Sequence, residues 1–383
     1  MKDKIYDLIA TTVFGLEAIV KRECEQLGFS DISVSNGKVE FKGNQQDIAK
    51  ANLWLRSSER VLIKLGEFEA KSFDDLYEKT KSINWEDYLS TNGKFLVSGK
   101  SIKSKLHSVP DAQSIVKKAI VDKMTKVHDI LWFKESEERY KIEVGLLKDT
   151  ATITLDTSGA GLHKRGYRLE QNKAPMKETL ASALVQLSNW RPDRPLVDLF
   201  CGSGTILIEA CLIGKNIAPG ISREFDFMKW PMFDISVFRE EKTKAYGAMN
   251  DNKLDITGFD IDKDAVKIAR QNAMNAGVED DIIFVTKDVK DVGLKNNFGV
   301  IVSNPPYGER IGDEDSITQI YEALKILFKK ISTWSIFMIT SDKDFEKQVG
   351  KTCDRKRKLF NGRIEVDYYQ YIGPNPDLLK WGN

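Results

Sequence analysis

The stretch Asn304-Pro305-Pro306-Tyr307 combines residue types that could hold a planar amine. Two consecutive prolines fix the backbone φ angle and remove two N–H donors, so the turn presents carbonyl acceptors. The side-chain oxygen of Asn304 and the carbonyl of Pro305 could accept both hydrogens of one exocyclic amine, while the ring of Tyr307 lies against the base that carries it. The structural alternative is a strand-ending turn with a half-buried tyrosine.

The apolar run before this turn, residues 298–303, is typical of a buried parallel strand. In open α/β sheets the carboxyl ends of such strands form the edge at which ligands bind. Three other apolar runs end in glycines or carboxylates, and the same sheet would bring these groups to that edge. They are 196–200 before Cys201-Gly-Ser-Gly-Thr205, 257–259 before Asp260, and 282–286 before Asp288.

Gly202 and Gly204 allow the backbone to approach a ligand at the amino terminus of a helix. A nicotinamide cofactor is disfavoured, because Leu207 stands where the dinucleotide fingerprint needs a third glycine. The carboxylate of Asp260 could accept both hydroxyls of a ribose or merely cap the next helix. Asp288 could accept an amino hydrogen of adenine or be a surface loop acid.

The length and composition of the chain limit the classes of protein to which it can belong. The chain has 383 residues, enough for two or three domains, and 41% hydrophobic with 30% charged residues is ordinary for a globular protein. Its four cysteines and three histidines form neither a C-x-x-C pair nor a zinc pattern, so no disulfide framework and no metal site are expected. No apolar stretch has the length of a membrane span, and no signal peptide is recognisable. We therefore expect a cytoplasmic protein that does not enter a membrane.

Positive charge gathers in two stretches, although the formal net charge is only +1. Residues 94–126 contain eight lysines and two acids, and residues 343–363 contain eight basic residues and three acids. Each stretch could contact the phosphates of a nucleic acid or be a solvated face.

The amino-terminal half has the short alternating elements of an α+β domain, with an antiparallel hairpin at Lys148-Asp149. From about residue 174 the pattern changes to α/β, and the glycine-rich basic stretch 158–168 is the best candidate linker. The expected strands of the first half are 5–12, 32–41, 60–68, 95–102, 140–147 and 150–155, and its expected helices are 14–27, 45–56, 72–82 and 111–128.

Four short motifs follow one another along the second half of the chain. They are D-L-F-C-G-S-G-T, G-F-D-I-D, K-D-V and N-P-P-Y-G. In this order they resemble class I methyltransferases that use S-adenosylmethionine and modify exocyclic amines. Almost the whole chain resembles the THUMP-domain RNA methyltransferases, especially the bacterial 23S rRNA guanine 2-amino enzymes. The wider resemblance rests on A-T-T-V-F-G-L-E at 10–17, H-K-R-G-Y-R at 163–168, A-P-M-K-E-T-L-A at 174–181, the insertion 215–252 and K-L-F-N-G-R-I-E at 358–365.

The resemblance implies a Rossmann-like α/β class I methyltransferase domain with an α+β amino-terminal half, which consists of a ferredoxin-like piece and a THUMP module. The predicted bounds are 1–69 for the ferredoxin-like piece, 70–157 for the THUMP module, 158–173 for a linker and 174–383 for the methyltransferase domain. Some relatives carry a second, fused methyltransferase domain, and none is expected here.

The resemblance also implies roles for individual residues. S-adenosylmethionine would be held by Asp198, Gly202 and Gly204 at its methionine moiety, by Asp260 at its ribose and by Asp288 at its adenine. Asn304, Pro305 and Tyr307 would hold the target amine in a direct in-line methyl transfer that needs no strong base, and the target nucleotide would be unpaired or flipped out. For RNA we single out Lys103, Lys105, Lys117 and Lys118, in the first basic stretch.

The substrate has alternatives. A guanine of 23S rRNA is expected, and tRNA remains open because relatives with the same module order modify either RNA. DNA adenine methyltransferases carry the same Asn-Pro-Pro-Tyr, which keeps a DNA amine open as well. A protein of another class, a non-catalytic RNA-binding assembly factor, would have a vestigial cofactor site.

Overall fold

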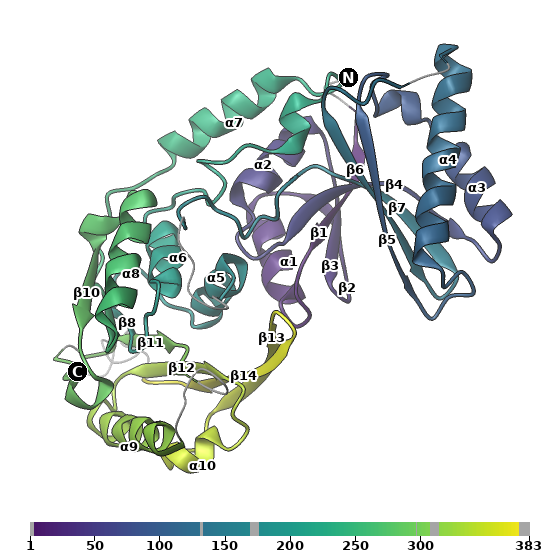
Figure 1. Ribbon diagram of the computed structural model, residues 1–383. Coiled ribbons are helices and arrows are strands. Elements are labelled where there is room, and N and C mark those ends of the chain that lie inside the picture. Colours follow the sequence, from purple (N-terminus) through teal and green to yellow (C-terminus); the bar gives the residue numbers. More distant parts are fainter. Residues whose placement is uncertain (1–3, 131–132, 169–175, 296, 307–313, 375–383) are drawn as a thin grey trace. The chain divides into compact units, whose positions relative to one another are not determined.

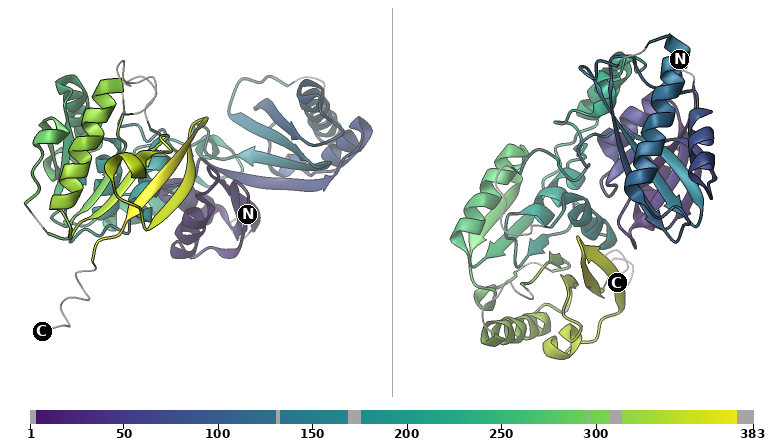
Figure 2. Two further views of the ribbon diagram at one scale, coloured as in Figure 1. Left: turned by 90° about the horizontal axis from the view of Figure 1, so that it is seen from below. Right: turned by 45° about the vertical axis from the view of Figure 1, so that its right-hand side comes forward.

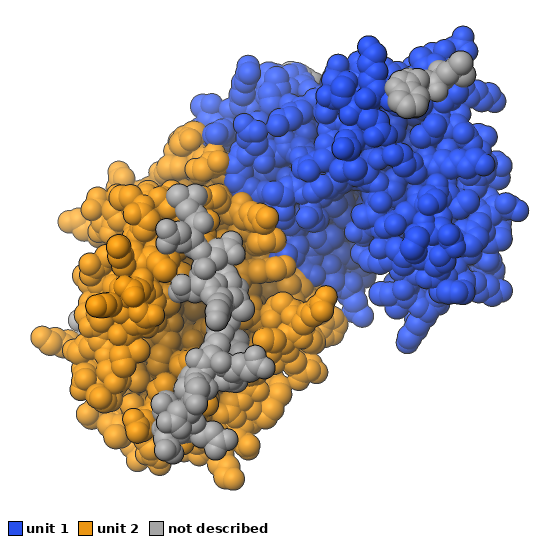
Figure 3. All heavy atoms as spheres, viewed as in Figure 1, with its two compact units in different colours: residues 1–12, 20–162, 223–244 blue, residues 13–19, 163–222, 245–383 orange. Residues whose placement is uncertain are grey.

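The computed structural model describes residues 4–130, 133–168, 176–295, 297–306 and 314–374 (Figure 1). Its contacts divide the chain into two compact units, which Figure 3 colours separately. The first unit contains residues 1–12, 20–162 and 223–244, and the second contains 13–19, 163–222 and 245–383.

The first unit is built on a seven-stranded sheet in the order β2-β3-β1-β4-β7-β6-β5. Neighbouring strands are antiparallel except β5 and β6, which are parallel. The strands are β1 Tyr6–Thr11, β2 Ser30–Ser35, β3 Lys38–Gly43, β4 Arg60–Glu69, β5 Lys94–Ile102, β6 Arg139–Leu147 and β7 Thr150–Asp156.

Helices of this unit begin where the sequence supplies caps. At α2 (Gln45–Trp54) Asn44 and Asp47 form a capping box, and Ser72 and Asp75 do so at α3 (Phe73–Lys81). Figures 1 and 2 show α3 and α4 (Val109–His128) on the same face of the β5–β7 part of the sheet. Two further helices, α1 (Glu17–Gln26) and α7 (Ile235–Gly247), have most of their residues in the first unit.

The predicted single strand over 32–41 is wrong. The chain forms two strands there, β2 and β3, which pair antiparallel across Asn36 and Gly37. Gly37 has a φ of 75°, which favours glycine, and Asn-Gly is a preferred two-residue hairpin turn. The pattern of apolar residues alone does not separate the two strands.

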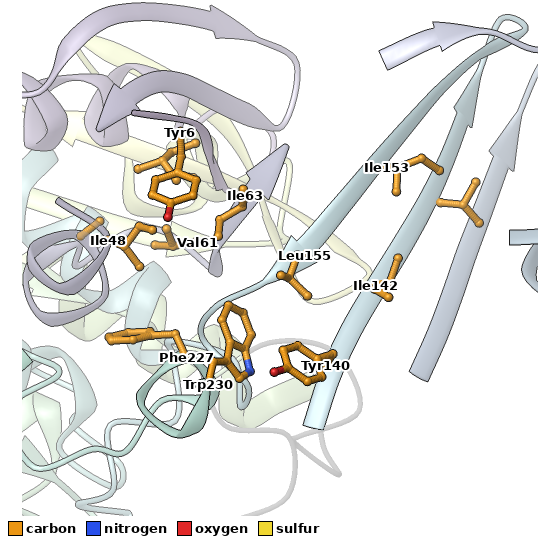
Figure 4. Packing of buried hydrophobic residues seen from close by; sticks show 14 of the residues in the cluster. Tyr6, Ile48, Val61, Ile63, Tyr140, Ile142, Ile153, Leu155, Phe227 and Trp230 are labelled. Carbon is orange, nitrogen blue, oxygen red and sulfur yellow. The ribbon is translucent and has the colours of Figure 1, made fainter. Parts of the chain in front are cut away.

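Part of the insertion in the second half of the sequence completes the first unit's core. Phe225, Phe227 and Trp230 are buried there, and Trp230 stacks on Tyr140 of β6 with ring centroids 5.3 Å apart (Figure 4). The indole N–H of Trp230 donates to the carbonyl of Arg139 over 3.1 Å, so the ring is satisfied as well as buried. Residues 223–244 are therefore part of this unit, although they lie within the predicted bounds of the methyltransferase domain.

The second unit contains a seven-stranded sheet in the order β10-β9-β8-β11-β12-β14-β13. The first five are parallel, while β14 is antiparallel to both of its neighbours. Its strands are β8 Leu196–Asp198, β9 Ile256–Asp260, β10 Ile282–Thr286, β11 Val300–Ser303, β12 Ser335–Thr340, β13 Arg355–Asn361 and β14 Ile364–Tyr371. Its helices are α5 Glu178–Leu187, α6 Thr205–Gly214, α8 Lys263–Asn275, α9 Glu314–Lys330 and α10 Phe345–Val349.

Buried apolar residues form two clusters in this unit, and between them they take residues from β8, β11, β12 and β14. Every residue of β11 and β12 is buried, as expected for central strands of a parallel sheet covered on both faces. This core fixes the strand ends that carry the predicted site.

The stretch predicted as a linker, 158–173, is divided between the two units as far as Arg168. Leu162 lies in the first unit's core, whereas Arg165 is 4% exposed in the second unit. Residues 169–173 lie outside the described part of the chain. The predicted domain bounds stay a prediction. Across the residues that the structure describes, no helix is long and apolar enough to cross a membrane.

Candidate active site

The strand order of the second unit reverses at β8. From β8 the chain continues through β9 and β10 on one side and through β11 and β12 on the other. Asp198 and Asp260 end β8 and β9, and Asn304 follows β11, so these side chains share the carboxyl edge at the switch point. Open α/β sheets bind their ligands at this place.

Asp198 is buried and anchored by its neighbour strand. Its Oδ1 accepts hydrogen bonds from Ser303 Oγ at 2.7 Å and from the Phe200 N–H at 3.1 Å. Ser303 Oγ accepts in turn from the Leu199 N–H at 2.7 Å. Burial raises the pKa of Asp198 to about 7, against the lowering effect of the Ser303 bond. Burial thus disfavours the charged form of Asp198.

The glycine loop after β8 has two residues that need to be glycine for different reasons. Gly202 has a φ of 51° and no neighbouring atom within 4 Å of the position of a Cβ. Gly204, with a φ of 81°, is the N-cap of α6, and a Cβ there would lie 3.1 Å from Ala269 Cβ and from the Phe284 ring. Gly204 therefore permits close packing, while the open side of Gly202 leaves space for a ligand.

Asp260 binds the same loop from the neighbouring strand. Its Oδ2 accepts from the Gly202 N–H at 2.8 Å, and its Oδ1 accepts from the Asp262 N–H at 3.0 Å. Burial raises its pKa. The cap of α8 is Asp262, whose Oδ1 accepts from the Asp264 N–H at 2.8 Å, so the capping alternative for Asp260 is wrong. Because each carboxylate oxygen can accept a second bond, Asp260 retains capacity for two hydroxyls.

Asp288 has local partners. It caps the short turn Val289–Asp291 by accepting from the Lys290 N–H at 3.0 Å, and its other oxygen lies 3.1 Å from Lys290 Nζ. The side chain is half-buried beyond the end of β10. Its assignment to adenine stays a prediction.

Asn304 carries the most informative atom of the site. Its Oδ1 is buried and finds no hydrogen-bond donor among the described residues. Pro305 is buried beside it, and Tyr307 lies outside the described residues. Buried acceptors in native proteins are nearly always paired, so this oxygen at a ligand-binding edge is a candidate acceptor for a donor of a ligand, and the role of Asn304 stays a prediction.

A buried polar network beneath the loop was missed by sequence reasoning. Arg165 Nε lies 3.3 Å from Glu209 Oε1, which also accepts from Tyr167 Oη at 3.2 Å. Arg168 Nη2 donates to the hydroxyl of Thr205, the first residue of α6, over 2.5 Å. These arginines fix α6 where the glycine loop enters it. Their sequence signal, R-G-Y-R, lies in the stretch predicted as a linker.

The four lysines predicted to bind RNA form two separate pairs. Lys103 and Lys105 are exposed in the loop after β5. Lys117 and Lys118 lie on α4, where Lys117 Nζ is 3.1 Å from Glu135 and Lys118 Nζ is 5.6 Å from the centre of the Tyr77 ring. The ammonium groups of the first pair are therefore more accessible to a phosphate than those of the second. The RNA role of all four lysines stays a prediction. Among the described residues no group of three or more metal-binding side chains gathers.

Strand order and switch-point site define a class I methyltransferase fold, joined to ferredoxin-like and THUMP modules. A family model described as RMKL-like, methyltransferase domain matches residues 165–370, the RlmL ferredoxin-like domain matches 7–62, and the THUMP domain matches 70–156. The chain belongs to the RMKL-like methyltransferase family.

Similar proteins support this assignment. YpsC of Bacillus subtilis (strain 168), named as a candidate RNA methyltransferase, is 51% identical over 96% of each chain. A Listeria monocytogenes protein, named as a predicted N6-adenine-specific DNA methylase, has a TM-score of 0.93 at 50% identity over 97% of each chain. SMU.472, a candidate methyltransferase solved in complex with SAH, also has a TM-score of 0.93, at 45% identity over 97% of this chain and 99% of that one.

The methyl donor is therefore S-adenosylmethionine, and the protein is an RNA methyltransferase that depends on it. The chemistry of the site fits this cofactor. Asp198 supplies a buried carboxylate suited to an ammonium group, Gly202 an open backbone, and Asp260 a carboxylate with spare acceptor capacity.

Proposed function

We propose that this protein methylates the exocyclic 2-amino group of a guanine in RNA, with 23S rRNA as the expected substrate. The observation that supports this most strongly is the buried Oδ1 of Asn304, which has no donor within the described chain. An –NH₂ group supplies a donor, whereas a keto oxygen or a ring nitrogen without hydrogen does not. The site therefore favours an amine as the atom to be modified.

The methionine end and the ribose of the cofactor would be held by Asp198, the glycine loop and Asp260. Asp288 would accept from the adenine. When bound, S-adenosylmethionine supplies a methyl group activated by a sulfonium. Each of these protein groups lies at or just beyond a strand end of the second unit, which gives them a common rigid support.

Asn304 and the carbonyl of Pro305 would accept the two hydrogens of the target amine. The lone pair of an aryl amine is delocalised into the ring, so acceptors that favour a tetrahedral, positive nitrogen assist its attack. Their bonds strengthen as positive charge develops, and catalysis then depends on positioning and electrostatics. Tyr307 would stack on the base, which must leave its helix for an in-line approach.

The assignment to RNA is supported by the THUMP module at 70–156 and by the name of YpsC. A DNA adenine amine is the second candidate, because the Listeria relative carries that name. Between RNA substrates, 23S rRNA is preferred because of the resemblance to the bacterial guanine 2-amino enzymes, with tRNA as the alternative. A cytoplasmic location stays a prediction.

The experiment is mass spectrometry of nucleosides from 23S rRNA, 16S rRNA and tRNA of a strain that lacks the gene, followed by methylation of that RNA, and in parallel of DNA from the same strain, with the purified protein and labelled cofactor. We expect N2-methylguanosine to fall in 23S rRNA and to be restored in vitro. Loss from tRNA alone would move the substrate to tRNA, and label appearing only in N6-methyladenine of DNA would contradict the proposal.

A further inference from the structure

Two sequence motifs that the cofactor and amine sites do not use meet in the second unit. They are A-T-T-V-F-G-L-E at 10–17, of which residues 13–17 belong to the second unit, and K-L-F-N-G-R-I-E at 358–365. Phe14 of the first and Phe360 of the second form an edge-to-face pair with ring centroids 6.4 Å apart. Figure 1 shows the hairpin β13–β14 approaching the loop that precedes α1.

The loop before α1 packs closely against the β13–β14 hairpin. Gly15 has a φ of 92°, and a Cβ there would lie 3.0 Å from the carbonyl oxygen of Lys358. Arg357 Nη1 donates to the carbonyl of Gly15 over 3.2 Å, and Leu16 and Leu359 are both buried in one core cluster. The backbone beneath the two phenylalanines is therefore held from both sides.

The phenylalanines themselves remain accessible. Phe14 is 53% exposed and Phe360 is half-buried. A core contact would bury both rings, whereas here they form a pair whose faces are accessible to a binding partner.

The strand register places this surface at the carboxyl edge of the sheet. Ser303 lies level with Met338 of β12, and β12 ends at Thr340, opposite Asp367 of β14. Beyond that level β13 and β14 continue as a hairpin, and Phe360 pairs with Glu365. Phe360 is thus two residues, or about 7 Å, past the end of β12. It lies at the same carboxyl edge of the sheet as Asn304, three strands away, which is about 14 Å across the sheet.

The local charge suits an anionic partner. Between Arg355 and Arg363 there are five basic residues and no acid, and two of the five, Lys356 and Lys358, are paired with Glu346 and Glu365 of neighbouring segments. Lys358 pairs with Glu365 and lies 6.0 Å from the centre of the Phe360 ring, while Arg363 is exposed at the turn. Aromatic rings beside cations form the combination that binds single-stranded nucleic acid, because bases stack on the rings and phosphates meet the cations.

We propose that Phe14, Phe360 and Arg363 form a stacking platform for an unpaired RNA nucleotide that lies near, but not adjacent to, the one presented to Asn304. This inference rests on the proposed function, since it names how the same RNA substrate is held. The platform keeps the strand open on one side of the target, so that the target base can leave the helix. A protein partner would use the same apolar rings without the need for unpaired bases.

The test uses the full chain with two probes, a fluorescein-labelled 12-nucleotide oligoadenylate and a 12-base-pair RNA duplex. Phe14→Ala and Phe360→Ala should each weaken oligoadenylate binding at least about fivefold and leave duplex binding unchanged, because only unpaired bases expose their faces. Phe360→Leu, which keeps an apolar side chain but no ring, should lose as much oligoadenylate affinity as Phe360→Ala. Arg363→Gln should weaken both probes and flatten their salt dependence.

Matched controls come from the opposite edge of the same sheet. Ile283→Ala on β10, where the side chain is 63% exposed, and Lys267→Gln on α8 should change neither probe. Cofactor affinity should stay at the wild-type value in every variant, which shows that the fold is intact. Wild-type oligoadenylate affinity in both phenylalanine variants would overturn the platform and favour a protein partner.

The same variants separate this inference from the proposed function. On rRNA from the deletion strain, Phe14→Ala and Phe360→Ala should raise KM for RNA and leave kcat nearly unchanged. If the wild-type protein methylates no RNA, the proposed function fails while the oligoadenylate result still decides the platform. If methylation proceeds with an unchanged KM in both variants, the platform alone is contradicted.

Discussion

Ser303 Oγ donates to Asp198 Oδ1 over 2.7 Å and accepts from the Leu199 N–H over 2.7 Å. One hydroxyl thus joins the end of β8, where the cofactor is expected, to the end of β11, where the target amine is expected. Since Ser303 directly precedes Asn304, this bond sets the distance between the two halves of the site.

Ser303→Ala should destabilise the protein by about 1–3 kcal/mol, because it leaves the buried Leu199 N–H without an acceptor and Asp198 with one donor fewer. Urea denaturation of the cofactor-free protein measures this. The matched control is Ser182→Ala, since the Ser182 hydroxyl is equally buried and has no partner in the described chain. Equal effects of the two substitutions would show that the Ser303 bond contributes nothing.

Asp198→Asn tests the raised pKa. With a folded-state pKa of about 7 and an unfolded value near 3.8, wild-type Asp198 binds more protons when folded. Its contribution therefore favours folding at low pH and is lost as the pH rises through this window. Asn at position 198 does not titrate, so the variant lacks this loss. The free energy of unfolding of Asp198→Asn, relative to that of the wild type, should therefore increase by about 2–3 kcal/mol between pH 5 and pH 8. A difference that is constant across pH would mean that Asp198 has an ordinary pKa.

Asp260→Ala should reduce affinity for S-adenosylmethionine roughly 10- to 150-fold, because it removes charge-assisted bonds and the anchor for the Gly202 N–H. Calorimetry measures the affinity. Asp262→Ala, which removes the adjacent carboxylate that caps α8, should cost about 1 kcal/mol of stability and leave the affinity nearly unchanged. Wild-type affinity in Asp260→Ala would contradict its assignment.

Replacing Lys103, Lys105, Lys117 and Lys118 with glutamine should weaken RNA binding and flatten its dependence on salt. The log–log slope should fall by about 0.7–0.9 for each lysine that meets a phosphate in the wild-type protein. The pair at 103 and 105 should account for the larger share, because Lys117 already has Glu135 as its partner. RNA affinity measured over a range of salt concentrations, with cofactor affinity as the control, tests this. An unchanged slope would identify the basic stretch as a solvated face.

Much of the second unit could be predicted because each strand ends in a residue with a physical reason to be there. Buried runs, the glycine loop and the strand-ending acids follow from local pattern, and the structure brings Asp198, Asp260 and Asn304 to one edge. Helix α8 likewise begins at its Asp262 cap, and Gly277, with a φ of 69°, follows its C-cap Ala276, so local signals mark both ends.

What the sequence did not indicate depends on contacts between distant residues. Ser303 is an ordinary strand residue until Asp198 lies beside it, and Arg165 resembles a linker residue until Glu209 neutralises it. The assignment of Trp230 to the first unit also required the position of Tyr140. Local propensity carries no information about partners of this kind.

Asn304 is expected to accept a hydrogen bond from the target amine. Its Oδ1 is buried without a donor in the described chain, so Asn304→Ala removes no turn-stabilising bond through that atom and should leave the melting temperature near wild type. Turnover should fall on the order of a hundred- to a thousandfold, while cofactor affinity is unchanged. The decisive measurement is single-turnover methylation of rRNA by this variant, with melting temperature and cofactor affinity determined on the same preparation. A variant that folds, binds the cofactor and transfers methyl groups at the wild-type rate would contradict the account.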